Sequence, residues 1–253
     1  MQQPVVVIGM GELGDLFAQG FLKCGHPVYP VLRGMDCAEV AERIPAPALV
    51  LVAVGENDLH GALDSVPPRW RDRLGLLQNE LLPRDWERHG MTDPTVIVVW
   101  FDKKKGKPLV ALLPTTVCGR QADVVLGALQ ALEIPCREVS ADERLYELVR
   151  KNLYILTINI AGIRTGGTVG ELWSGHGKLV VDVANEILDV QEHLTRCRLP
   201  RKRILAGLLE GFAGDPQHVC MGRTAGERLH RTLLQAREAG ISTPALSGIA
   251  AGG

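Results

Sequence analysis

The sequence predicts an α/β protein in which a doubly wound, mostly parallel sheet is followed by an all-helical domain. Three observations lead to this prediction. Short runs that are almost entirely apolar recur through residues 1–139, as expected of strands buried on both faces of a parallel sheet. Segments with the spacing of amphipathic helices separate these runs. From Ser140 onward the pattern is helical only.

We therefore expect two domains, residues 1–139 and residues 140–253. The expected strands are Val5–Ile8, Val28–Leu32, Ala48–Val54, Leu74–Gln78, Thr95–Trp100, Leu109–Leu113 and Cys136–Val139. Helices are expected through Leu16–Cys24, over Ala141–Ile163 and at the segments 176–195, 201–210 and 223–239, and short helical or turn stretches at Asn57–Val66 and Gln121–Leu132.

Three connecting segments carry expectations of their own. The charged run Lys103–Pro108 is typical of a tight hairpin turn, which would let the later strands run antiparallel. Thr115 and Thr116 are expected to cap a loop, with a place in the ligand crevice as the alternative. The small-residue tail from Ser247 to Gly253 is expected to be frayed.

A glycine-rich turn follows the first expected strand. Gly9, Gly11 and Gly14 form a G-x-G-x-x-G pattern between that strand and the first helix. Gly9 allows the tight turn, and Gly11 lets a pyrophosphate approach the helix N-terminus. Gly14 lets the helix pack closely on the strand. The pattern predicts a dinucleotide-binding site, and the alternative is a tight turn without a ligand.

The end of the second expected strand indicates which dinucleotide is bound. An NAD site usually places an acidic residue there, to bind the ribose 2′-hydroxyl. This chain has Arg33 followed by Gly34, and the nearest acid, Asp36, lies further on. A guanidinium suits a 2′-phosphate, which it can bind through paired, charge-assisted hydrogen bonds. NADP(H) is therefore favoured over NAD(H), and a surface arginine in a loop is the alternative.

Composition restricts the class of function. The net charge of −1 offers no field that would recruit nucleic acid or a membrane surface, so a small-molecule substrate is the expected partner. The six cysteines form no C-x-x-C pair, which favours a reduced, cytoplasmic protein without a structural metal. The first strand begins too early to leave room for a signal peptide. No apolar run reaches the roughly 18 residues that span a bilayer.

The long helix expected at Ala141–Ile163 carries a candidate catalytic side chain. Lys151, Ile155 and Asn159 fall at i, i+4 and i+8 and so lie along one side. A lysine facing the ligand crevice can polarise a carbonyl oxygen and donate a proton to it. Periodicity alone instead favours a solvated face at residues 150–152.

Taken together, these segments resemble ketopantoate reductase (2-dehydropantoate 2-reductase) and its wider group of NADP-dependent reductases, over nearly the whole chain. The glycine turn and Arg33 are similar to the nucleotide fingerprint of that family. Further similar segments are L-x-Q-N at residues 76–79, K-x-x-x-N-x-x-x-N at 151–159, the Gly170-Glu171-Leu172 triplet and the G-I-x-x-P ending at 240–244.

The resemblance implies a Rossmann-type domain, a helical domain like the C-terminal one of 6-phosphogluconate dehydrogenase, and association as a homodimer. It implies that Lys151 is the general acid and that Asn79 and Asn159 orient substrate and cofactor. The residues it implies for cofactor binding are Gly9, Met10, Gly11, Glu12, Leu13, Gly14, Arg33, Val54 and Asn79.

The chain departs from the family pattern where substrate would bind. Ile155 replaces the first asparagine of the lysine motif, and Glu80 replaces the glycine after Gln78-Asn79. Glu56 follows the third strand, where the family often has a lysine, and Thr224 or Gly226 stands at the position of the substrate-binding glutamate. Glu56 and Glu80 would repel a keto acid. We therefore expect a substrate other than ketopantoate.

Three functions are compatible with the sequence. The leading one is an NADPH-dependent reductase of a small carbonyl or imine compound. The second is a catalytically inactive module that binds or senses NADP(H) or docks a partner, which Ile155, Glu80 and Thr224 favour. The third is a dehydrogenase of a cationic or amino-bearing substrate, for which Glu56 and Glu80 would be favourable.

Overall fold

In the computed structural model, the described residues are 2–103, 106 and 108–252. The chain divides into two compact units, Met1–Glu147 and Leu148–Gly253, and the boundary falls within the long helix α6 (Ala141–Thr165). The first unit combines a sheet with helices, and the second is built from helices.

Unit 1 is built on a seven-stranded sheet with the order β2-β1-β3-β4-β5-β8-β9. The strands are β1 (Val5–Ile8), β2 (Val28–Val31), β3 (Leu49–Val52), β4 (Leu74–Leu76), β5 (Thr95–Val98), β8 (Thr115–Cys118) and β9 (Cys136–Glu138). Neighbouring strands are parallel except for β5 and β8, which pair antiparallel. The order β2-β1-β3 reverses the winding between β1 and β3, and ligands of such sheets bind at that switch point.

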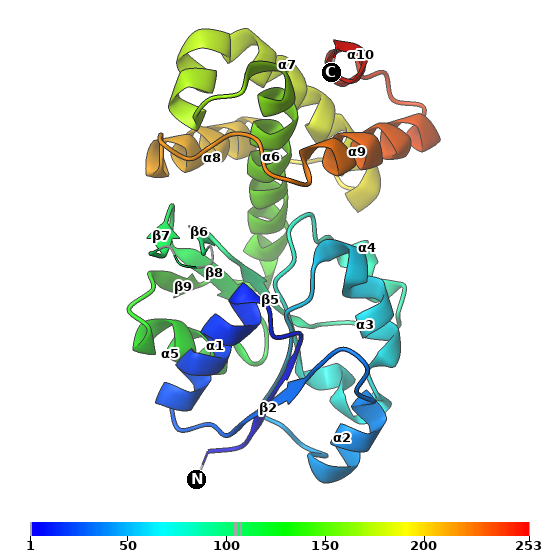
Figure 1. Cartoon of the computed structure of the whole chain (residues 1–253). Helices are drawn as coiled ribbons and strands as arrows, with labels where there is room; N and C mark the ends of the chain where they lie inside the picture. The colour runs from blue at the N-terminus through cyan, green and yellow to red at the C-terminus, as the bar shows by residue number, and fades with distance from the viewer. Residues whose placement is uncertain (1, 104–105, 107, 253) are drawn as a thin grey trace. The chain divides into compact units, whose positions relative to one another are not determined.

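Helices cover both faces of the sheet (Figure 1), which confirms the doubly wound α/β class. One face carries α1 (Glu12–Lys23) and α5 (Ala122–Ala131), and the other carries α2 (Cys37–Arg43), α3 (Leu59–Ser65) and α4 (Pro83–Glu87). Two short 3₁₀ helices, η1 (Glu56–Asp58) and η2 (Pro68–Arg73), flank α3. The helices α1 and α5 pack so closely that a Cβ at Gly20 would lie 2.6 Å from the carbonyl oxygen of Ala128. The core between these helices and the sheet includes Phe17, Phe21 and Val125, all fully buried.

The structure corrects the sequence prediction around residue 115. Thr115 and Thr116 belong to β8 and are buried, so they neither cap a loop nor line a crevice. The Thr115 hydroxyl accepts a hydrogen bond from the backbone N–H of Trp100 at 3.1 Å. Threonine has good β propensity. This strand nevertheless lacks the apolar run that predicts the other strands, because its first two residues carry hydroxyl groups.

A second, two-stranded antiparallel sheet pairs β6 (Phe101–Asp102) with β7 (Val110–Ala111). The strand expected at Leu109–Leu113 is thus shorter than predicted. The charged turn expected at Lys103–Pro108 lies partly outside the described residues, because residues 104, 105 and 107 are not among them.

Unit 2 contains the rest of α6, followed by α7 (Val169–Thr195), α8 (Arg201–Gly214), α9 (Ala225–Ala239) and α10 (Pro244–Gly252). Helix α7 begins earlier than predicted, at a capping box in which the Thr168 hydroxyl accepts from the Glu171 backbone N–H and the Glu171 carboxylate accepts from the Thr168 backbone N–H. Its backbone departs from helical geometry at His176, where the predicted helix begins.

The expectation of a frayed tail is wrong for residues 247–252, which belong to α10 (Pro244–Gly252). The Glu186 carboxylate of α7 accepts hydrogen bonds from the backbone N–H groups of Ala245 (2.7 Å) and Leu246 (2.9 Å). A carboxylate at a helix N-terminus satisfies unpaired N–H groups and interacts favourably with the helix dipole. Leu246 and Ile249 are buried, so packing adds to this cap.

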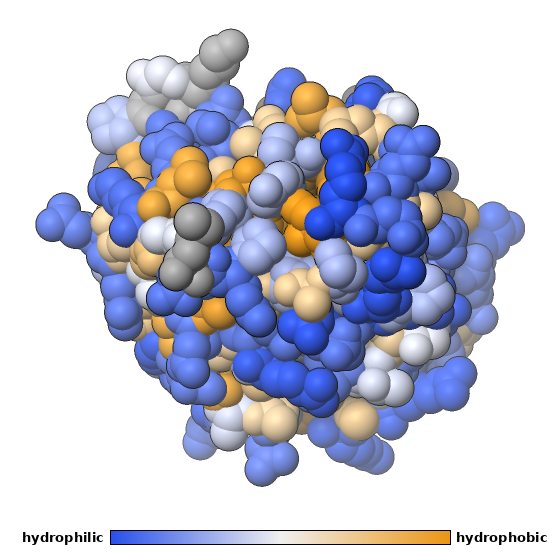
Figure 2. All heavy atoms as spheres, turned by 90° about the horizontal axis from the view of Figure 1, so that it is seen from below, coloured by the Kyte–Doolittle hydropathy of each residue, from blue (hydrophilic) through white to orange (hydrophobic). Residues whose placement is uncertain are grey.

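The face of the molecule drawn in Figure 2 is mostly hydrophilic, with hydrophobic residues exposed in small separate groups. Within the described part of the chain, no helix combines the length and the apolar character needed to cross a bilayer.

Candidate functional site

A pocket of about 700 Å³ lies at the switch point of the sheet in unit 1. It is formed by the loops that follow three adjacent parallel strands, β1, β2 and β3, together with α3. The carboxyl ends of parallel strands meet at one edge of the sheet, which brings these loops together. The lining residues are Ile8, Gly9, Met10, Gly11, Val31, Leu32, Arg33, Gly34, Met35, Cys37, Ala53, Val54, Gly55, Asn57, Asp58, Gly61, Ala62 and Ser65.

The three glycines of the turn after β1 have distinct surroundings. Gly9 has a φ of 92°, a conformation that residues with a Cβ rarely adopt. A Cβ at Gly14 would lie 2.0 Å from the carbonyl oxygen of Gly9, so the first turn of α1 packs directly on the loop. At Gly11, by contrast, an added Cβ would meet nothing within 4 Å.

Gly11 also stands at the N-cap of α1, where no side chain accepts a hydrogen bond from the first turn. The N-terminus of a helix therefore opens onto the pocket beside a residue without a side chain. Backbone N–H groups and the helix dipole make such a position suitable for an anion. This arrangement fits the pyrophosphate of a dinucleotide, for which Gly11 leaves the space.

Arg33 follows β2 and lines the pocket, and its side chain is 94% exposed. Asp36, the nearest acid in sequence, accepts a hydrogen bond from the backbone N–H of Ala38 at 2.8 Å and so caps α2. Asp58 of η1 is the carboxylate that approaches Arg33, with its Oδ2 atom 3.7 Å from Nη2. The sequence does not indicate Asp58 as a neighbour of Arg33, because Asp58 follows β3 and Arg33 follows β2.

Four other residues expected at the cofactor differ in where they lie. Val54 lines it. Asn79 does not, but its Nδ2 atom donates to the Glu56 carboxylate at 3.1 Å, which links the ends of β4 and β3. Leu13 packs on the apolar core. Glu12 lines a different cavity of about 540 Å³.

Glu80, which replaces a glycine of the family pattern, has a φ of 61°. This left-handed conformation costs a residue with a Cβ more than it costs glycine. The backbone thus keeps a geometry that suits glycine, while the side chain adds a carboxylate after Asn79.

Lys151 lies in unit 2, on α6, and is 9% exposed. Its Nζ atom is 5.7 Å from the centre of the Tyr154 ring, within the range of a cation–π interaction. Its neighbours are also buried: Arg150 pairs with Glu210 at 2.7 Å, and the Asn152 amide contacts Gln191 at 3.4 Å. The solvated face that periodicity favours at residues 150–152 is therefore wrong, because α7 and α8 cover this side of the helix.

Asn159 is held by two hydrogen bonds within unit 2. Its Nδ2 atom donates to the Ile155 carbonyl at 2.8 Å, and its Oδ1 atom accepts from the Gly222 backbone N–H at 2.9 Å. The side chain thus joins α6 to the segment that precedes α9. Thr224 and Gly226 lie at the start of α9, and Glu227 in its first turn is exposed.

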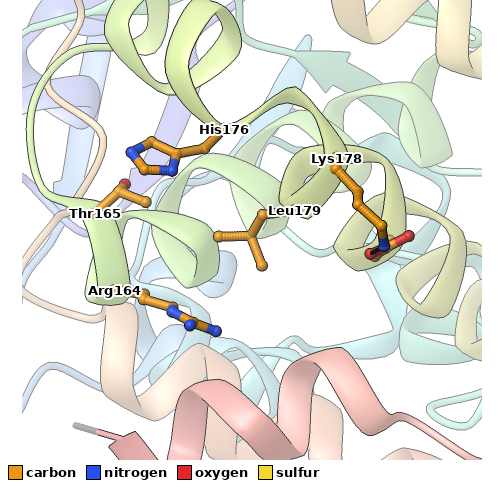
Figure 3. A pocket seen from close by; sticks show the side chains of 6 residues that line it. Arg164, Thr165, His176, Lys178 and Leu179 are labelled. Atoms are coloured by element: carbon orange, nitrogen blue, oxygen red, sulfur yellow. Dashed lines mark hydrogen bonds and ion pairs between the residues drawn. The ribbon is translucent and has the colours of Figure 1, made fainter.

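Unit 2 also has a pocket of about 340 Å³, lined by Arg164, Thr165, His176, Lys178, Leu179 and Asp182 (Figure 3). Lys178 points away from Arg164 and His176 and pairs with Asp182 at 2.7 Å. Neither Lys151 nor Asn159 lines this pocket, so it is separate from the predicted catalytic side chains.

Two histidines that the sequence analysis overlooked meet between α3 and α4. The rings of His60 and His89 lie end to end with their centroids 5.3 Å apart, and His60 Nδ1 is 3.0 Å from His89 Nε2. Arg88 Nε donates to His60 Nδ1 at 3.0 Å, so this nitrogen carries no proton. Asp64 lies 2.8 Å from His89 Nδ1.

This cluster predicts a pH dependence of folding stability. Burial, and then the Arg88 charge, lower the pKa of His60 below 6.5. As the pH falls from 6.5 through that lowered pKa, the unfolded chain binds a proton that the folded chain resists, so stability is lost. Burial raises the pKa of Asp85, which acts in the opposite sense, but from a reference of 3.8.

We expect His60→Gln to flatten the decline of the free energy of unfolding between pH 7 and pH 5, measured by urea denaturation. The exposed His230→Gln variant is the control. An unchanged slope in His60→Gln would contradict the assignment.

Solved structures of other proteins share this architecture. No protein-family model and no curated protein sequence matches the chain. The 2-dehydropantoate 2-reductase of Methylococcus capsulatus has a TM-score of 0.70 at 14% identity, covering 98% of this chain and 94% of that chain. The chain has the ketopantoate reductase fold. The resemblance drawn from sequence is thereby confirmed for the fold, and both units are included in the match.

Two further structures with the ketopantoate reductase fold are informative. The ternary structure of D-mandelate dehydrogenase with NADH and anilino(oxo)acetate has a TM-score of 0.66 at 12% identity, covering 97% of this chain and 95% of that chain. A dimeric ketopantoate reductase from Staphylococcus aureus has a TM-score of 0.63 at 14% identity, with the same coverages of 97% and 95%. Identities this low establish the fold and leave the activity to the chemistry of the site.

Proposed function

We propose that this protein is an NADPH-dependent reductase of a small carbonyl or imine compound other than ketopantoate. The observation that carries the proposal is the pocket at the β1/β3 switch point. It combines an open position at Gly11, an uncapped helix N-terminus and a guanidinium at the end of β2. These three features together suit a dinucleotide that carries a 2′-phosphate.

Each part of the nucleotide has residues suited to it. The turn at Gly9–Gly11 would hold the pyrophosphate, and Arg33 would bind the 2′-phosphate. Val54 and Asn79 follow β3 and β4 and would lie toward the nicotinamide end. When bound, the nucleotide supplies the hydride that reduces the substrate carbon.

Lys151 would supply the proton. A buried ammonium can donate a hydrogen bond to a carbonyl oxygen and then transfer a proton to it. Tyr154 packs beside Lys151 and restricts where the ammonium can lie. Asn159 holds α6 against the segment before α9, so in this proposal it positions the helix that carries Lys151.

The substrate class follows from the charges around Asn79. Glu56 accepts from the Asn79 amide, and Glu80 follows it in sequence. Two carboxylates at this place disfavour a keto acid and are compatible with a neutral or amino-bearing compound. Homodimerisation is a further part of the proposal, since the S. aureus protein of the same fold is dimeric.

A binding module without catalytic activity is the second candidate. Ile155 removes a polar group from the lysine side of α6, and both ends of the Asn159 amide already have partners. A protein that binds NADPH but reduces no compound in a panel of aldehydes, ketones and imines would support this candidate.

Titration of the protein with NADPH and NADH by calorimetry tests the proposal. We expect NADPH to bind, and Arg33→Ala to weaken its binding by about 10- to 100-fold, as loss of a charge-assisted contact does. Arg120→Ala, which removes an exposed arginine of the same unit outside the pocket lining, is the matched control. Absence of binding by either nucleotide would contradict the reductase and the NADP(H)-sensing module alike.

A further inference from the structure

We infer that Asp58 sets the cofactor selectivity of this pocket: it competes with a 2′-phosphate for Arg33 and accepts hydrogen bonds from the ribose hydroxyls of NAD(H). The inference rests on the proposed function and concerns the same pocket. It makes the protein a user of both nicotinamide dinucleotides, with a weaker preference for NADP(H) than Arg33 alone would produce.

The first step is the composition of the pocket wall. Among the described residues that line it, Arg33 is the one cation and Asp58 the one carboxylate. They come from different segments, the turn after β2 and the helix η1 after β3, and their charged atoms lie 3.7 Å apart. The wall therefore carries no net charge at the place where the ribose phosphate would bind.

The second step excludes two other acids, Asp36 after β2 and Glu56 after β3, from the role of ribose acceptor. Asp36 is used as the cap of α2, where it accepts from Ala38. Glu56 accepts from the Asn79 amide. Neither lines the pocket, whereas Asp58 does, and its side chain is 63% exposed and thus accessible to a ligand.

The third step is electrostatic. A ribose 2′-phosphate brings about two negative charges close to Asp58, which repels them, while a 2′-hydroxyl can donate a hydrogen bond to the carboxylate. The same side chain therefore disfavours one nucleotide and favours the other. Because both groups are exposed, solvent and salt reduce the size of each effect.

The test is Asp58→Asn, which keeps the shape of the side chain and removes its charge. We expect the affinity for NADPH to rise about 3- to 10-fold and the affinity for NADH to fall by a similar factor, both by calorimetry. Added salt should reduce the gain for NADPH, because screening weakens the repulsion that the variant removes.

Glu39→Gln is the matched control, since it removes the same charge from an exposed position of α2 outside the pocket lining. It should leave the ratio of the two dissociation constants unchanged. Asp58→Ala serves as a second variant, and thermal unfolding of each variant checks that unit 1 is folded.

The possible outcomes distinguish the role of Asp58 from the proposed function. NADPH binding with an unchanged NADPH-to-NADH ratio in both Asp58 variants would overturn the role of Asp58 and leave the proposed function intact. Failure of the unmodified protein to bind either nucleotide would overturn both. A change of equal size in Glu39→Gln would show a general charge effect and also overturn the role of Asp58.

Discussion

Replacing Lys151 with methionine is expected to lower the turnover number by about 10²- to 10⁴-fold and to leave NADPH affinity nearly unchanged, as loss of a positioned acid does. Methionine keeps an unbranched apolar side chain in a site where lysine is only 9% exposed. The variant therefore removes the ammonium beside Tyr154 with little loss of packing. The measurement is steady-state kinetics with the best substrate of a carbonyl and imine panel, paired with calorimetry of NADPH.

Lys178→Met is the matched control for this experiment. Lys178 lies in the same unit, is 90% exposed and pairs with Asp182, so its loss should leave turnover unchanged. Full turnover in Lys151→Met would remove Lys151 from the mechanism. Lost turnover together with lost NADPH binding would instead indicate a structural role.

Replacing Gly14 with alanine is expected to destabilise unit 1 by about 1–3 kcal/mol or more, the usual cost of forcing extra atoms into a packed site. The added Cβ would lie 2.0 Å from the carbonyl oxygen of Gly9, which is backbone and cannot rotate away. The start of α1 would have to move away from the loop after β1. Urea denaturation of the variant and the parent protein measures the loss.

Gly11→Ala is the matched comparison, because it adds the same methyl group where nothing lies within 4 Å. Its stability should change little, since its backbone is extended (φ −82°, ψ −168°) and suits alanine. Its NADPH affinity should nevertheless fall, because the methyl group occupies the space through which a pyrophosphate approaches the helix. Equal losses of stability in the two variants would contradict the geometry of the turn.

Local structure in this protein was predictable where consecutive residues carry an apolar or glycine pattern. The strand Val5–Ile8, the glycine turn and α1 follow one another directly, so periodicity and glycine spacing identify them. The same holds for the strands at the centre of the sheet, whose apolar runs reflect burial on both faces. Prediction failed where the signal was not apolar, as in β8, or where the cap is distant, as with Glu186 at the start of α10.

The residues of the candidate site also fall into two groups, those that local patterns predict and those that only the tertiary structure brings together. The sequence by itself determined that Gly9, Gly11 and Gly14 stand at a turn between strand and helix, and that Arg33 lies just after the next strand. It also placed Lys151 and Asn159 on one helix, because that spacing is a local property. These residues were found from short-range patterns alone.

Only the tertiary structure decided which side chains meet. Asp58 approaches Arg33, and His60 contacts His89, because segments that are distant in sequence are brought together by the fold of unit 1. It likewise showed that residues 150–152 are buried, since α7 and α8 cover that face of α6. The physical reason is that spacing along the chain defines the geometry within one helix or turn, whereas contacts between elements depend on strand order and helix packing, which no local pattern encodes.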